Sequence, residues 1–72
     1  MTGKEAVAKA KQRLKDGLPV KLWAKDSTEE IKFYPEGFYS VYYQGSELCK
    51  GMNRCHEVME EKFLSEPEVF IL

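Results

Sequence analysis

The stretch that decides the fold reads EIKFYPEGFYSVYY at residues 30–43. Its first part alternates apolar and polar residues, with Ile31 and Phe33 on one side, and residues 38–43 are dense in aromatic and β-branched residues. Both patterns are typical of half-buried strands. The intervening YPEG, residues 34–37, has the chemistry of a type I turn closed by a left-handed glycine. This stretch therefore predicts a β-hairpin.

A helix and a further strand are predicted upstream of the hairpin. Residues 19–25, PVKLWAK, alternate in the same way, which favours a strand. Residues 3–16 are expected to form a helix, because Thr2 and Glu5 fit a capping box and Gly17 offers a left-handed stop. Its narrow apolar stripe consists of Ala6, Val7, Ala10 and Leu14. This helix can therefore bury only one thin face.

Two interpretations are open for residues 46–52. Gly45 and Ser46 fit the centre of a type II′ turn, which pairs Tyr43 with Leu48 and adds a fourth strand to the meander. Alternatively, a single helix begins at Ser46, because apolar residues recur at helical spacing. These residues are Leu48, Met52, Cys55, Met59 and Phe63. We favour the turn.

In the favoured version, Asn53 caps a second helix that runs to Leu64. Residues 68–72, EVFIL, are too apolar to be free in water, so we expect them to form a closing strand or to pack into the core. The sequence thus predicts one α+β domain over residues 1–72. Its expected order is an N-terminal helix, an antiparallel meander of three to four strands, a second helix and a short C-terminal strand.

Composition and charge place few limits on function. The chain has 72 residues, 43% hydrophobic and 32% charged, which is typical of globular proteins. No apolar run approaches ~18 residues and residues 1–5 do not resemble a signal peptide, so we expect a cytoplasmic protein without membrane contact. Residues 1–25 hold seven basic and two acidic residues, whereas residues 26–72 hold four and ten. We favour two oppositely charged elements that pack side by side.

The residue pattern does not favour catalysis, a metal or a cofactor. His56 is the only histidine, and with Cys49 and Cys55 it provides three soft ligands where a structural zinc needs four. Neighbouring residues of a helix point about 100° apart, so Cys55 and His56 are expected to be a buried thiol and an exposed imidazole rather than a catalytic pair. No glycine-rich phosphate motif occurs. We therefore expect no enzyme.

One side of the predicted sheet is unusually aromatic. The side expected to face the helices carries Val20, Leu22, Ile31, Phe33, Tyr39, Val41 and Tyr43. The opposite side carries Trp23, Tyr34, Phe38 and Tyr42 beside Lys21, Lys25 and Lys32. A sheet covered on one face normally shows polar residues on the other, so these rings need an explanation.

Three interpretations compete for the aromatic side. The rings are ordinary core beneath residues 67–72 or beneath a second copy of the chain. Alternatively, they bind a protein, with Trp23, Tyr34 and Tyr42 as anchors and the three lysines as rim. Finally, they can stack on the bases of single-stranded nucleic acid while the lysines contact phosphates, although the acidic second part of the chain and the absence of an RNP-type motif weigh against this.

The sequence therefore predicts a small non-enzymatic binding or regulatory protein that acts through protein contacts of its aromatic sheet face. The alternative is a single-stranded nucleic-acid-binding domain that uses the same rings with Lys21, Lys25 and Lys32. A homodimer is compatible with both. The size suits an accessory protein of a bacterium or a phage.

Overall fold

The computed structural model describes residues 1–51 and 53–72. Its elements are α1 (Gly3–Lys15), β1 (Val20–Ala24), β2 (Glu29–Phe33), β3 (Tyr39–Tyr43), β4 (Ser46–Gly51), α2 (Cys55–Phe63) and β5 (Val69–Ile71). This order confirms the predicted α+β fold with a four-stranded meander. The alternative helix from Ser46 is wrong, because residues 46–51 are strand. Met52, which that helix would include, lies outside the described residues.

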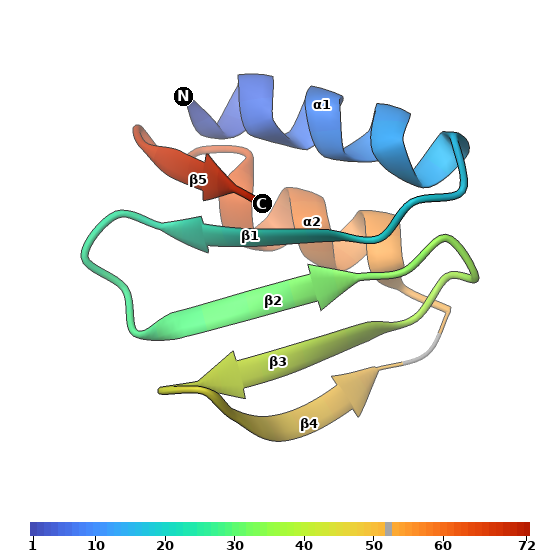
Figure 1. Ribbon diagram of the computed structural model, residues 1–72. Helices are drawn as coiled ribbons and strands as arrows, with labels where there is room; N and C mark the ends of the chain where they lie inside the picture. The colour runs from blue at the N-terminus through green and yellow to red at the C-terminus, as the bar shows by residue number, and fades with distance from the viewer. Residues whose placement is uncertain (52) are drawn as a thin grey trace.

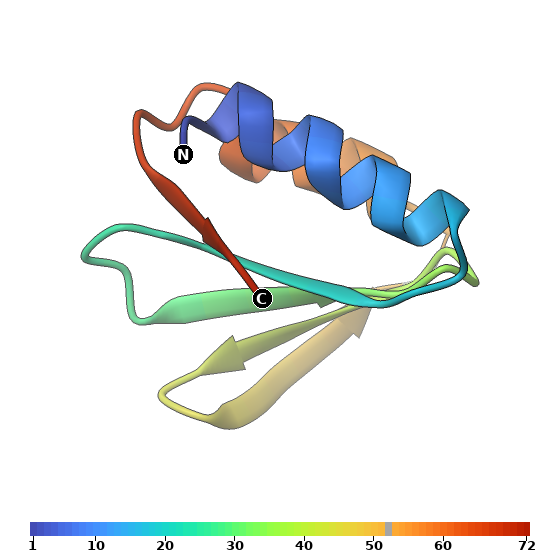
Figure 2. The ribbon, with the colours of Figure 1, turned by 45° about the horizontal axis from the view of Figure 1, so that its top comes forward.

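The five strands form one antiparallel sheet in the order β4-β3-β2-β1-β5 (Figure 1). Both helices lie on one side of this sheet, above β5, β1 and β2 (Figure 2). The C-terminal segment forms the predicted closing strand and pairs with β1, Trp23 opposite Phe70. It therefore extends the sheet instead of covering its aromatic side.

The ends of α1 follow the sequence signals. Thr2 accepts a hydrogen bond from the Glu5 N–H, and the Glu5 carboxylate accepts one from the Thr2 N–H, which completes the predicted capping box. At the other end Gly17 has a φ of 82°, and the Leu18 N–H donates to the Arg13 carbonyl at 2.9 Å. This Schellman-type stop ends the helix one residue earlier than predicted.

The hairpin of β2 and β3 also has the predicted turn. Gly37 adopts a φ of 106°, which a side chain would strain, and its N–H donates to the Tyr34 carbonyl at 3.0 Å. The Tyr34 N–H donates in turn to the Phe38 carbonyl at 3.0 Å. The turn therefore sets Ile31 opposite Val41.

Two details of the following segment differ from the prediction. The turn before β4 is centred on Gln44 and Gly45, both at positive φ, so Tyr43 pairs with Ser46 rather than with Leu48. This is the type I′ pattern, which needs a left-handed residue at both centres and favours glycine at the second. Asn53 does not cap α2, because its φ of 59° is left-handed whereas an N-cap residue is extended. The helix begins at Cys55 instead and ends at Phe63.

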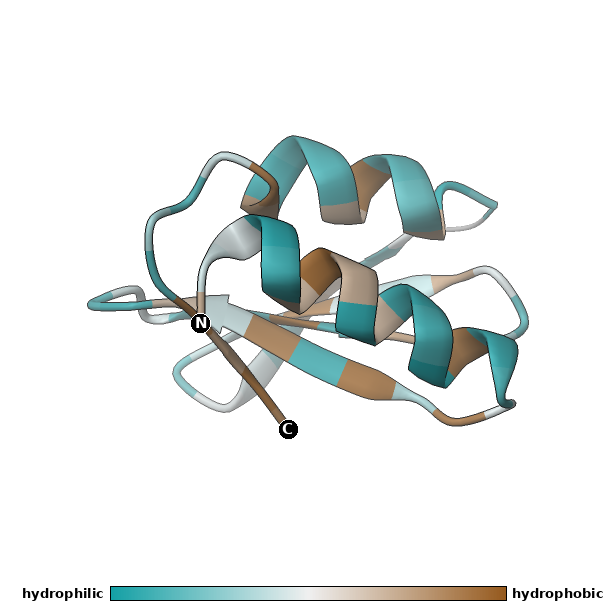
Figure 3. Cartoon of the chain, turned by 90° about the horizontal axis from the view of Figure 1, so that it is seen from above, coloured by the Kyte–Doolittle hydropathy of each residue, from teal (hydrophilic) through white to brown (hydrophobic). Residues whose placement is uncertain are grey.

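The core lies between the helices and the covered side of the sheet. Its largest fully buried side chains are Phe33, Leu22, Ile31, Met59, Val20 and Val69. All four predicted apolar residues of α1 are buried, and hydropathy alternates along β1 (Figure 3). Tyr43 was also expected to face the helices, but it is 45% exposed because it stands at the end of β3, beyond their reach.

The two helices pack side by side with opposite charge. The Lys11 Nζ of the basic α1 lies 2.9 Å from a Glu60 carboxylate oxygen of α2. This contact confirms the side-by-side interpretation of the charge separation. Because both side chains are partly exposed and water screens their charges, the pair contributes little to stability.

Candidate functional site

The candidate site is the side of the sheet that faces away from the helices, which we call the outer face. Strand alternation and the pairing register assign its members, because residues opposite one another in an antiparallel pair share a side. They are Lys21, Trp23, Glu30, Lys32, Tyr34, Phe38, Ser40, Tyr42, Glu47, Lys50 and Phe70. Both helices lie on the opposite side, so the outer face has no helical cover (Figure 2).

The three lysines of the outer face lie in one row across four strands, which we call the basic row. Lys21 of β1 is opposite Lys32 of β2, Lys32 is opposite Ser40 of β3, and Ser40 is opposite Lys50 of β4. Like charges directly opposite one another are destabilising. Of the three lysines in this basic row, Lys21 has a carboxylate partner among the described residues, Glu30 at 3.4 Å.

Two stacked ring pairs flank the basic row. Trp23 of β1 stacks on Phe70 of β5 with ring centroids 5.7 Å apart and planes 23° apart. Tyr34 and Phe38 stack across the turn between β2 and β3, with centroids 4.4 Å apart. Stacked aromatic pairs contribute about 0.5–1.5 kcal/mol beyond the area that they bury, so stacking favours the observed ring orientations.

Each lysine of the basic row lies over a ring. The Lys32 Nζ is 5.3 Å from the Tyr34 centroid, the Lys50 Nζ is 5.5 Å from that of Phe38, and Lys21 is 5.9 Å from that of Tyr42. Cation–π attraction works at these distances. The outer face therefore holds ring surfaces and ammonium groups in one connected arrangement.

Ser40 occupies the centre of the outer face and is only 1% exposed, although no helix covers it. Its cross-strand neighbours are Lys32 and Lys50, whose long apolar stems can exclude water from it. The pKa of Tyr42 is raised above its ordinary value of 10.0, and the main cause is the polar interaction of its hydroxyl with that of Tyr34. Partial burial and nearby Glu47 raise this pKa further, whereas Ser40 lowers it.

We expect Tyr42 to ionise at a higher pH than an ordinary tyrosine, whose pKa is 10.0. Because the pKa of Tyr42 is raised in the folded chain, its contribution to stability is complete below pH 10 and is lost as pH rises through the folded pKa. An absorbance titration of tyrosinate checks this, with Tyr42→Phe removing the late step and Tyr34→Phe moving it to lower pH. A late step that survives Tyr42→Phe would contradict the assignment.

The structure brings five of the six predicted binding residues together. Trp23, Tyr34, Tyr42, Lys21 and Lys32 all belong to the outer face. Lys25 does not join them, because β1 ends at Ala24 and Lys25 lies in the exposed turn beyond it. Its backbone N–H donates to the Glu68 carbonyl, which holds this turn beside the residue before β5.

Sequence reasoning missed three members of the outer face, Glu47, Lys50 and Phe70. Phe70 could have been assigned from the alternation of the final strand, once that strand was placed beside β1. The alternation of residues 38–43 does place Ser40 on this side, but its burial gave no signal, because it depends on long side chains from two other strands. Lys50 also gave none, because a β-bulge between Val41 and Tyr42 changes which residues of β4 face outward.

The thiols and the imidazole do not form a second site. Both cysteines are free, Cys49 exposed and Cys55 buried, and burial raises the pKa of the Cys55 thiol, which disfavours its nucleophilic form. His56 is exposed, as predicted. Within residues 1–51 and 53–72, no group of three or more His, Cys, Asp and Glu side chains could hold a metal ion. No helix of the described chain is long and apolar enough to span a membrane.

Comparison with known proteins gives no relative: no family model matches this chain, and no curated protein or solved structure is significantly similar to it. The functional proposal therefore depends on the chemistry of the outer face.

Proposed function

We propose that this chain is a small intracellular binding or regulatory protein that captures a protein partner on its outer face. One observation carries the proposal: two stacked ring pairs and three lysines occupy the side of the sheet that the helices leave uncovered. Aromatic residues dominate the centres of protein interfaces because they bury a large area at a small entropic cost.

The rings of the outer face suit a docking role because they are only partly buried. Trp23, Tyr34, Phe38 and Tyr42 each retain intermediate exposure, and Phe70 is 40% exposed. Such rings bury further area when a partner arrives, and they lose little freedom because an aromatic side chain has only two rotatable bonds. Trp23 and Tyr42 are the expected anchors.

The basic row supports a partner with carboxylates. Lys21 and Lys32 lie directly opposite one another, an arrangement that costs free energy in the isolated chain. Carboxylates of a bound protein would relieve this repulsion and would also pair with Lys50, the third cation of the row. We therefore propose a partner segment in which apolar side chains contact the rings and Asp or Glu side chains contact the row.

The proposal is tested by capture on the immobilised protein. We expect the wild type to retain a partner from an extract of its native host, and Trp23→Ala and Tyr42→Ala each to abolish this retention while the far-ultraviolet spectrum stays unchanged. Leu18→Ala is the control, because Leu18 is 53% exposed and lies outside the outer face. Amide hydrogen exchange of the complex then shows protection on β1 to β3.

Two results would contradict the proposal. Trp23→Ala and Tyr42→Ala could both unfold the chain, in which case the rings are core. Equal retention by wild type and both variants would place the contact elsewhere on the molecule.

Single-stranded nucleic acid is the second candidate, and the lysines that lie over rings favour it. Rings stack on bases and ammonium groups contact phosphates in such platforms. This function predicts that the logarithm of the affinity for an oligonucleotide falls linearly with the logarithm of the salt concentration. Each phosphate contact adds about 0.7 to the steepness of this line. Lys21→Glu should reduce the slope by about one contact, and Lys25→Glu by less, because Lys25 lies apart. No binding at low salt would remove this candidate.

A further inference from the structure

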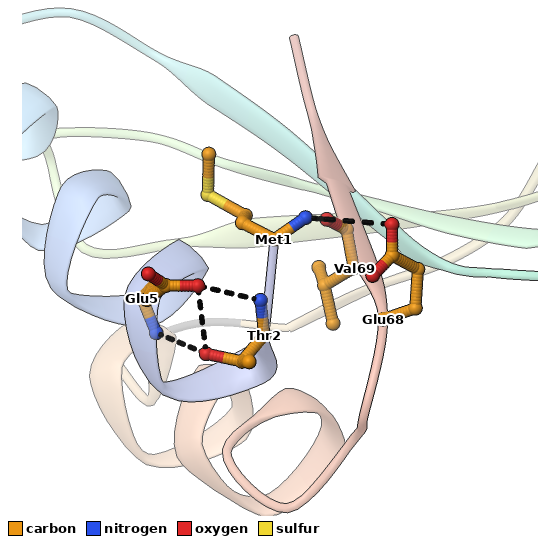
Figure 4. A network of polar contacts seen from close by, with 5 residues as sticks. All are labelled: Met1, Thr2, Glu5, Glu68 and Val69. Atoms are coloured by element: carbon orange, nitrogen blue, oxygen red, sulfur yellow. Dashed lines mark hydrogen bonds and ion pairs between the residues drawn. The ribbon is translucent and has the colours of Figure 1, made fainter.

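The two edges of the sheet differ in how they are covered. At the β5 edge, the Val69 N–H donates to the Met1 carbonyl at 2.7 Å. The Met1 amino group donates to the Val69 carbonyl at 3.3 Å (Figure 4). The same amino group lies 3.5 Å from a Glu68 carboxylate oxygen. Met1 therefore occupies the backbone N–H and C=O of Val69, and a further strand cannot pair at this residue without displacing Met1.

The β4 edge has no such cover. It is the last strand in the sheet order, and its residues are exposed except Gly51, which is half-buried. Tyr43 and Ser46 close a two-residue turn, where the flanking residues are hydrogen-bonded to each other, so the next residue, Glu47, directs its N–H and C=O away from β3. Leu48 is 62% exposed. The edge thus offers unpaired backbone groups and an apolar side chain.

Because of the β-bulge, successive residues of β4 do not alternate strictly between the outer face and the helix side of the sheet. Glu47 is opposite Tyr42 and Lys50 is opposite Ser40, so both charged residues of β4 belong to the outer face although they are three positions apart. Cys49 is opposite Val41 and faces the helices, and Leu48 lines the same helix-side hollow, of about 330 Å³. Along β4 the sides therefore run outer, inner, inner, outer over residues 47–50.

The order of sides over residues 47–50 reads the same from either end. Two antiparallel copies of β4 can therefore pair so that every residue lies opposite a residue on the same side of the sheet, and the charges then select one register. A two-fold axis between Leu48 and Cys49 places Glu47 opposite the second copy's Lys50 on the outer face, twice, and Leu48 opposite the second copy's Cys49 on the helix side. Each opposed pair then shares a side. If the two-fold axis passed through Glu47 or Lys50 instead, opposed residues would still share a side. That residue would then lie opposite its own copy, and the two like charges would repel each other.

We propose that two copies of this chain pair through β4 in this register and form one continuous ten-stranded antiparallel sheet. Glu47 and Lys50 make no ion pair within the described residues of one chain, so both charges are available to the second copy. The two Leu48 side chains meet beside the axis and lose their exposure to water. The helices of both copies lie on one side, and the two outer faces join into one surface on the other.

Charged and bulged edges usually resist pairing, and the same features give specificity here. A regular strand matches the side order of β4 only by leaving one residue of β4 without an opposite partner, as β3 does at Leu48, because its own sides alternate strictly. A second β4 matches this order residue by residue, because it carries the same bulge. The free edge therefore favours its own copy over a regular strand.

Sedimentation equilibrium across a range of concentrations tests the proposal. We expect the wild type to dimerise, and Glu47→Lys and Lys50→Glu each to raise the dimer dissociation constant by about tenfold or more, because each change turns both cross-strand pairs repulsive. A 1:1 mixture of the two variants should restore the dimer, since every opposed pair in the mixed dimer is attractive. Lys4→Glu on α1 is the control for the change in net charge and should leave the dimer intact.

Two results would overturn the proposal. One is a wild type that stays monomeric at all concentrations. This result includes the case in which the β4 edge pairs with a different protein, so that the β4 amides become protected from hydrogen exchange only when that protein binds. The other is a dimer that both single variants retain, because its contact would then lie elsewhere. The mixing experiment guards against variants that fail to fold, since only folded chains can restore the dimer.

Discussion

Phe33→Ala is expected to lower the free energy of unfolding by about 3–5 kcal/mol, the usual cost of removing a fully buried phenylalanine. Phe33 is 0% exposed and joins three elements, with its ring edge-on to Phe63 of α2 and tilted against Tyr39 of β3, both at 6.3 Å. A domain of this size has roughly 4–11 kcal/mol of stability in total. The variant should therefore melt about 15–30 °C below the wild type.

Phe38→Ala is the matched control for this prediction, because it removes the same side chain from the opposite side of the sheet. Phe38 contributes its stack on Tyr34 and the area of a partly exposed ring, so we expect a loss of about 1–2 kcal/mol. Thermal unfolding followed by circular dichroism compares the two. Equal losses would contradict the assignment of one side as core and the other as surface.

Trp23→Ala is expected to separate binding from stability. Folding loses the stack on Phe70 and the area that the ring buries against the sheet, about 2 kcal/mol, which is less than for a fully buried ring because Trp23 is partly exposed. Partner affinity should fall at least about 30-fold, since an interface tryptophan at an anchor position contributes 2 kcal/mol or more. Calorimetric titration of the captured partner, together with a denaturant curve of the free variant, measures both quantities.

The same titration on Leu18→Ala should return the affinity of the wild type. If Trp23→Ala instead lost as much stability as Phe33→Ala, the outer face would be core. If it kept full affinity, the partner would bind another surface.

Much of the fold could be predicted from local sequence, because its signals are strong and short-range. The capping box at Thr2 and Glu5, the glycine stop of α1 and the YPEG turn each determine structure within a few residues, and all three are present. Strand alternation then assigned Ile31 and Phe33 to the core and Trp23 and Tyr42 to the other side.

The errors lie where two conformations compete within one or two residues. Gly45 can serve as the first centre of one turn type or the second centre of another, and only the pairing of β4 with β3 decides between them. Asn53 is a good N-cap by residue type, but the chain leaving β4 holds it in a left-handed conformation. Neither constraint is visible in the local sequence.

The candidate site could be predicted only in part for a related reason. The rings were assigned from alternation, which is local, whereas the basic row depends on register across four strands. Lys50 joins that row because a bulge reverses the sides of β4, and Lys25 leaves it because β1 ends one residue before it. Non-local pairing therefore determines which cations can act together.

The most direct measurement is acrylamide quenching of the fluorescence of Trp23, the chain's single tryptophan, in the free protein and with the captured partner bound. An indole on an uncovered docking face should be readily quenched in the free protein and should become protected on saturation with partner. Resistance to quenching in the free protein would mean that the ring is interior. Unchanged quenching in the complex would mean that the partner docks away from this side of the sheet.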